Sequence, residues 1–124
     1  MIIAIDFDGT VVTHEYPHIG DSIGAEEVLM ELVKNGNKII LNTMRSGKLL
    51  DNAKDWFKQR KIPIWAYNEN PEQRKWTSSP KIYANLYIDD SNLGCPLKIV
   101  GNSPRPVADW VKIREQLVKE GILD

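Results

Sequence analysis

The feature that most constrains this chain is the alternation of short apolar runs with longer segments of helical periodicity. Five runs have the length and residue types of buried strands: 2–7, 38–43, 64–67, 86–88 and 97–100. Three other segments carry apolar residues on one helical face: 22–35, 46–57 and 107–120. Strands that alternate with helices form right-handed βαβ units. The pattern therefore predicts a three-layer α/β/α, Rossmann-like fold, with helices on both faces of a mostly parallel sheet of about five strands.

The length and composition predict one soluble domain, residues 1–124. The net charge is −1, and no basic stripe that would indicate a nucleic-acid partner is present. No apolar run approaches the roughly 20 residues of a membrane-spanning helix. The apolar start, Met1 to Ile5, lacks the basic residues of a signal peptide and is expected to be a strand. Cys95 is the single cysteine, which excludes an internal disulfide and fits a reducing cytoplasm.

The first apolar run ends in Asp6-Phe7-Asp8-Gly9-Thr10. Asp-Gly between apolar runs is typical of a β-hairpin turn, in which Gly9 would adopt positive φ. Alternating acids also begin a calcium-binding EF-hand loop, but Val11 stands where that loop needs Gly and Pro17 where it needs Glu. The calcium loop is excluded, whereas this stretch alone leaves the hairpin open.

Polar residues also follow two other expected strands. Asn42-Thr43 ends the second run and Asp89-Asp90 follows the fourth, while Lys81 begins the segment that leads into the fourth. Taken singly, the Thr could cap a turn, the acid pair could form an Asx turn and the Lys could be a solvated surface residue. In open α/β sheets, however, ligands bind beyond the carboxyl ends of the strands, where these residues would meet.

Electrostatics predicts a cation among these acids. Two carboxylates about 4 Å apart repel by about 4 kcal/mol at an effective dielectric constant near 20. Placing Asp6, Asp8, Asp89 and Asp90 at one sheet edge is therefore costly without a positive charge between them. Mg²⁺ prefers oxygen ligands and is commonly bound by one or two carboxylates together with a substrate phosphate. Lys81 would add a charge suited to a phosphoryl oxygen.

With these residues in order, the chain resembles the haloacid dehalogenase superfamily of phosphotransferases. The resemblance rests on Asp6 to Thr10, Thr43, Lys81 and the Asp89-Asp90 pair, which together span most of the chain. It implies that the first strand lies between the strands that end at Thr43 and at Asp89. It also implies that Asp6 is the nucleophile that forms an aspartyl-phosphate, and that Asp8 is the general acid and base.

The same resemblance implies a Mg²⁺-dependent phosphomonoester hydrolase. The metal would be held by the Asp6 carboxylate, the Asp8 backbone carbonyl and Asp89, with support from Asp90. The phosphoryl oxygens would be bound by Thr43, Lys81 and the backbone amides from Phe7 to Gly9. Lys75 is a nearby competitor for the role of Lys81, which is favoured because it lies closer to the final strand.

The intervals between these motifs leave no room for a separate cap domain, because helices, strands and one polar loop occupy them. An open site suits a phosphorylated macromolecule; alternatively, a second copy of the chain or the loops 11–21 and 68–80 would close it over a small molecule. Four residues of these loops and of the Thr43 turn are candidates for the substrate mouth: Tyr16, His18, Arg45 and Trp76.

Two other functions remain as alternatives. A non-catalytic regulatory module could bind phosphate and Mg²⁺ on the same fold, although a pure binder would not need an acid at Asp8. A two-component receiver domain would carry its phosphorylated Asp at the end of the third strand, where this chain has Tyr67-Asn68. The sequence thus favours a hydrolase and leaves its substrate unidentified.

Overall fold

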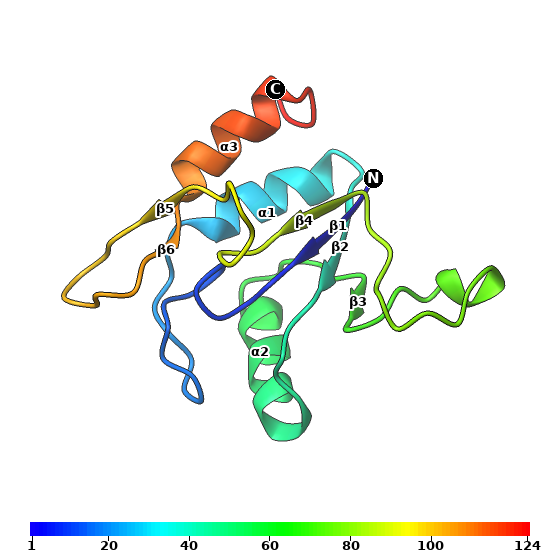
Figure 1. Ribbon diagram of the computed structural model, residues 1–124, viewed down its shortest axis with the longest axis horizontal. Coiled ribbons are helices and arrows are strands. Elements are labelled where there is room, and N and C mark those ends of the chain that lie inside the picture. The colour runs from blue at the N-terminus through cyan, green and yellow to red at the C-terminus, as the bar shows by residue number, and fades with distance from the viewer.

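A four-stranded parallel sheet forms the centre of the computed structural model, which describes residues 1–124. The strand order is β3-β2-β1-β4 (Figure 1). The strands are β1 (Ile2–Ile5), β2 (Lys38–Leu41), β3 (Ala66–Tyr67) and β4 (Leu86–Ile88). The expected position of the first strand, between the strands that precede Thr43 and Asp89, is confirmed.

Three α-helices and one short 3₁₀ helix, η1, accompany the sheet. They are α1 (Ala25–Lys34), α2 (Gly47–Gln59), η1 (Gln73–Lys75) and α3 (Trp110–Lys119). The last helix begins at Trp110 rather than at 107, because Val107 and Ala108 form a strand and the Asp109 side chain caps the helix by accepting from the Lys112 amide. None of these helices combines the length and apolarity required to cross a membrane.

The prediction that a fifth strand joins the central sheet is wrong. Residues 97–100 do contain a strand, β5 (Leu97–Lys98), but it pairs antiparallel with β6 (Val107–Ala108) in a separate two-stranded sheet. Only residues 89–96 connect β4 to β5. A parallel crossover needs about a dozen residues or more, so this connection is too short to return the chain to the same sheet edge.

The helices pack on one face of the sheet, so the three-layer arrangement is not observed. Side chains of all three α-helices belong to one core with Ile3, Ile5 and Phe7 of the first strand and its extension. The opposite face carries a smaller cluster, Ala4, Ile40, Ala66 and Ala84, to which no helix contributes. The connection from β3 to β4 would supply a helix to this face, but it contains only η1.

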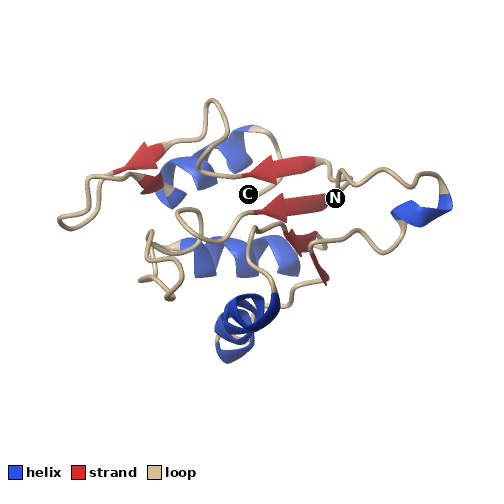
Figure 2. Cartoon of the chain, turned by 60° about the horizontal axis from the view of Figure 1, so that its bottom comes forward, coloured by secondary structure: helices blue, strands red, loops and turns tan.

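That connection, residues 68–85, extends past the amino ends of the strands. In Figure 2 the arrows of the main sheet point away from the protruding segment that carries the short helix η1. An ion pair at 3.7 Å between Lys38, the first residue of β2, and Glu72 agrees with this placement. The segment therefore lies at the edge of the sheet opposite to the carboxyl ends.

Candidate active site

The carboxyl ends of β1 and β4 bring three of the predicted acids together. Ile5 pairs with Ile88, so that Asp6 and Asp89 follow side by side, and the Asp6 amide donates to the Ile88 carbonyl at 3.0 Å. One carboxylate oxygen from each of Asp6, Asp89 and Asp90 lies within 4.8 Å of the others. The residues are partly buried. This convergence of acids from two separate strands matches the sequence-based expectation.

The Thr10 hydroxyl joins two of these acids. Its Oγ1 lies 3.0 Å from Asp6 Oδ2 and 3.0 Å from Asp90 Oδ1, and it accepts from the Asp90 amide at 2.9 Å. A hydroxyl carries one proton and can donate to only one carboxylate at a time. The cluster therefore contains more acceptor oxygens than the neighbouring hydroxyl can satisfy.

This environment raises the pKa of Asp6 to about 7. Burial is the largest cause, followed by the charge of Asp89 and the hydrogen-bonded neighbour Asp90; the Thr10 hydroxyl and the Phe7 amide act in the opposite direction. The Asp6 carboxyl group is thus costly to ionise in the protein alone. A positive charge among the three acids would favour the ionised form.

The donor set fits a divalent cation. All three side chains offer hard carboxylate oxygens at a spacing that one ion can bridge, which is the ligand type that Mg²⁺ prefers. The Asp8 side chain is not part of this group. Of the four predicted metal ligands, Asp8 could take part only through its backbone carbonyl, which is the contribution that the family resemblance implies.

The Asp8 carboxylate is instead bound by Arg45. Arg45 Nε donates to Asp8 Oδ2 at 2.8 Å and Nη2 donates to Oδ1 at 2.7 Å, a bidentate pair. The Asp8 side chain is 20% exposed, whereas that of Arg45 is fully buried. Both oxygens of the expected acid and base are therefore engaged.

Arg45 does not line a substrate mouth, and that prediction is wrong. Its remaining N–H groups donate to three backbone carbonyls, those of Pro17, His18 and Leu49, at 2.8 to 3.3 Å. With the two bonds to Asp8, all five guanidinium N–H donors have an acceptor. The rings of Phe7 and Tyr16 lie 5.2 and 5.3 Å from the guanidinium carbon. No donor remains for a substrate.

The other predicted mouth residues lie in two separate parts of the molecule. His18 contributes its backbone carbonyl to Arg45, and its side chain is exposed on the same loop as Tyr16. Trp76 follows η1 and packs edge-on against Tyr83, with ring centroids 5.8 Å apart. It lies beyond the amino ends of the strands, so the structure does not place it, or the 68–80 loop, over the acids.

Thr43 lies two residues after the end of β2 and forms no hydrogen bond with the acids. Its hydroxyl accepts from the Arg45 amide at 3.1 Å, and its amide donates to Asn68 Oδ1 at 2.8 Å. Asn68 adopts a left-handed conformation with φ of 54° and also donates to the Arg45 carbonyl. Asn68 thus fixes the turn that carries Thr43, a role that the sequence did not indicate.

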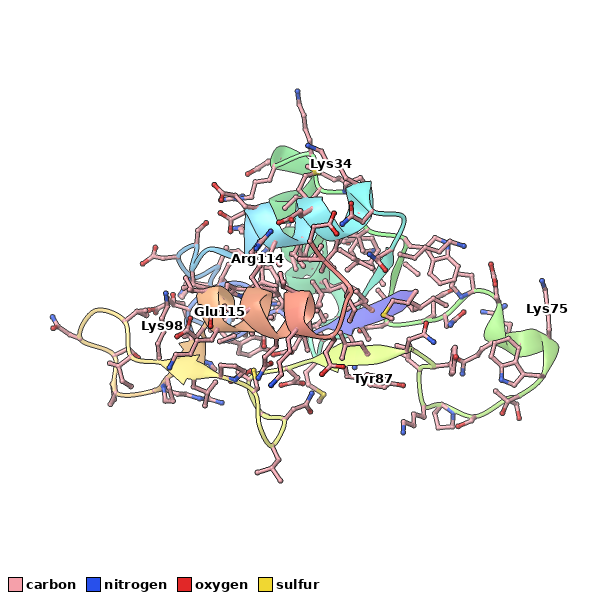
Figure 3. All side chains as sticks on the ribbon, turned by 90° about the horizontal axis from the view of Figure 1, so that it is seen from above. Lys34, Lys75, Tyr87, Lys98, Arg114 and Glu115 are labelled. Atoms are coloured by element: carbon pink, nitrogen blue, oxygen red, sulfur yellow. The ribbon has the colours of Figure 1, made fainter.

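A groove connects the acids with Lys81. Its lining includes Asp6, Asn42, Lys81, Tyr87 and Asp89. Lys81 Nζ lies over the Tyr87 ring, 5.8 Å from its centroid, and forms no ion pair. The competing lysine, Lys75, lies on η1 and points outward from the tip of the protruding segment (Figure 3). Both lysines belong to the 68–85 segment at the amino ends of the strands, so the structure brings neither of them to the acids, although Lys81 lines the groove that extends to Asp6.

The segment before α3 and the first residue of that helix donate hydrogen bonds to the loop that follows β1. The Ala108 amide donates to the Gly9 carbonyl at 2.9 Å, and the buried Trp110 indole Nε1 donates to the Thr10 carbonyl at 2.6 Å. Trp110 lies in the segment 107–120, for which the sequence indicates only an apolar helical face. Nothing in the local pattern indicates these contacts, because about a hundred residues separate the partners.

Comparison with known proteins gives one informative relative. No protein-family model and no curated protein matches the sequence. Among solved structures, a protein of Bacteroides thetaiotaomicron described as a conserved protein is 39% identical, with a TM-score of 0.78. The match covers 98% of this chain and 91% of that one. The chain belongs to the same family as this Bacteroides protein. The relative's description states no activity, so function has to be argued from the site.

Proposed function

We propose that this protein is a Mg²⁺-dependent phosphomonoester hydrolase of the haloacid dehalogenase type, working in the cytoplasm. The observation that carries the proposal is the convergence of Asp6, Asp89 and Asp90, whose carboxylate oxygens lie within 4.8 Å of one another. Such a cluster is expensive to ionise unless a cation completes it, and the cation could then also bind an anionic substrate. The ordered motifs from Asp6 to Asp90 supply the second line of support.

Asp6 is the proposed nucleophile. One of its carboxylate oxygens would form a bond to phosphorus while the bond from phosphorus to the leaving oxygen breaks, and water would then hydrolyse the aspartyl-phosphate. A bound Mg²⁺ would supply charge neutralisation for the carboxylate and the phosphoryl oxygens. Asp6, Asp89 and Asp90 would hold it.

Asp8 is the proposed proton donor to the leaving oxygen and acceptor from the attacking water. Because Arg45 binds both of its oxygens, at least one of the two contacts must open when a substrate oxygen approaches. Thr43 and Lys81 are the proposed phosphate ligands, together with the amides of Phe7 to Gly9. Lys81 would have to leave the Tyr87 ring and extend along the groove.

Phosphate release from p-nitrophenyl phosphate, with Mg²⁺ and with EDTA, tests the proposal. Wild-type protein should turn over only with Mg²⁺, and Asp6→Asn should lose activity by several orders of magnitude because the amide cannot form the acyl-phosphate. Asp51→Asn is the matched control, since Asp51 is an exposed acid of α2. Full activity in Asp6→Asn would refute the mechanism.

The Asp8–Arg45 pair favours one alternative, a phosphate- and Mg²⁺-binding module without turnover. In such a module Asp8 would only anchor the loop, as it does in this structure. A panel of sugar phosphates, nucleotides and phosphopeptides separates the two functions. Binding of Mg²⁺ without phosphate release from any member of the panel would favour the module.

A further inference from the structure

The His14 ring contacts Asp90 at Oδ2, whereas Thr10 contacts the other carboxylate oxygen, Oδ1. His14 Nε2 is 3.3 Å from Asp90 Oδ2 and 3.1 Å from the Pro106 carbonyl oxygen. The His14 side chain is 12% exposed and that of Asp90 is 10% exposed.

The two polar neighbours of the His14 ring determine which of its nitrogens carries the proton. A carbonyl oxygen and a carboxylate oxygen both accept hydrogen bonds, so Nε2 must be the nitrogen that carries the proton. The Nε2 hydrogen bond goes to the Pro106 carbonyl, and the same nitrogen lies 3.3 Å from Asp90 Oδ2. Asp90 Oδ1 lies 3.0 Å from Thr10 Oγ1, so His14 and Thr10 contact opposite oxygens of the carboxylate and restrict its orientation.

Gly9 makes this approach possible. A Cβ atom at Gly9 would overlap the His14 imidazole ring and would lie 2.8 Å from Asp90 Oδ2. The residue also has a φ of 82°, a conformation that side chains rarely adopt. Gly9 thus allows the backbone turn at positive φ and also leaves space for the His14 ring.

The histidine is itself held in place. Pro106, whose carbonyl it contacts, begins the segment whose Ala108 amide binds the Gly9 carbonyl. His14 therefore sits between the loop after β1, the loop after β4 and the segment before α3. A rotation of the ring away from Asp90 would break both of its polar contacts.

We propose that His14 is a positioning residue that holds Asp90 in the orientation required for cation binding. This inference rests on the proposed function, because it concerns the cation that Asp6, Asp89 and Asp90 would share. Groups that orient metal ligands typically contribute a factor of about 10 to 100 in metal affinity. Removal of the His14 N–H should weaken Mg²⁺ binding by that factor.

Isothermal titration with MgCl₂ alone, without substrate, measures the effect. His14→Gln keeps an amide N–H near the position of Nε2 and should bind Mg²⁺ within about threefold of wild type. His14→Leu removes the donor and should bind about 10- to 100-fold more weakly. His18→Leu is the matched control in the same loop, because the His18 side chain is exposed and makes no polar contact.

Each outcome of the titration supports or overturns the positioning role of His14. Wild-type affinity in a folded His14→Leu variant overturns the positioning role, and so does equal weakening in His14→Gln and His14→Leu. If His14→Leu does not fold, His14→Asn, whose amide is one methylene too short, replaces it and should bind more weakly than His14→Gln. Absence of Mg²⁺ binding by wild-type protein would overturn the proposed function itself, and the positioning role with it.

Discussion

Removal of Arg45 tests the most completely bonded side chain near the site. We expect Arg45→Met to lower the free energy of unfolding by about 3 kcal/mol. Breaking one partner of a buried ion pair costs about 3 to 5 kcal/mol, because the remaining charge is left unpaired. Asp8 is 20% exposed, so water can solvate part of its charge, which places the expected cost at the lower end.

Urea unfolding followed by tryptophan fluorescence measures the change. With a slope of about 2 kcal/mol per molar urea, the midpoint should fall by about 1.5 M. Arg114→Met is the matched control. Arg114 binds Glu31 through Nε and Nη2 at 3.0 and 2.7 Å, the same bidentate geometry, but these two side chains are 40% and 36% exposed. Its midpoint should shift far less.

A double-mutant cycle assigns the loss to the ion pair. Asp8→Asn removes the charge that Arg45 compensates, so Arg45→Met should cost less in that background than in wild type. Three backbone carbonyls still lose their donors, and some destabilisation should therefore persist. An Arg45→Met midpoint equal to that of Arg114→Met would show that burial does not strengthen the pair.

Three further predictions address Asp6, Gly9 and Lys81. Without metal, the free energy of unfolding should fall as pH rises from about 4 to about 7, because in that window the folded state retains the Asp6 proton and the unfolded state has lost it. Urea midpoints measured across this pH range should show the fall, and Asp6→Asn should remove this pH dependence. Gly9→Ala should lower the thermal midpoint well below that of Gly36→Ala, because both glycines have positive φ but only Gly9 faces a side chain. Lys81→Ala should raise KM for p-nitrophenyl phosphate about tenfold or more, whereas Lys75→Ala should leave it unchanged.

The parts of the fold that the sequence predicted depend on local patterns. β1, β2 and β4 and the three helices follow from apolar runs and helical periodicity, and the meeting of Asp6 with Asp89 follows from the parallel pairing of β1 with β4. The fifth strand failed because an apolar run does not state its partner. Residues 97–100 have strand character, but the short connection 89–96 sends them to Val107 and Ala108.

The site residues that were missed or misplaced depend on distant contacts. Arg45 follows the end of β2 by four residues, so its position indicated the site, but its N–H groups are satisfied by carbonyls in the 11–21 loop and in α2. His14 gains its partner from a residue 76 positions later, Asp90. Short-range patterns carry no information about such pairs, and only the folded chain shows them.

The missing helical layer also explains how an uncapped site can admit substrate. Side chains alternate along β1, so Ile3 and Ile5 face the helices while Ala4 and Asp6 face the side that no helix covers. Asp6 therefore opens into the groove shared with Lys81 and Tyr87. The groove also extends past β4 to α3, where Ile113, Gln116 and Leu117 line it. The replacement of a crossover helix by the 68–85 segment thus leaves the Ala4 and Asp6 side of β1 without a helical layer.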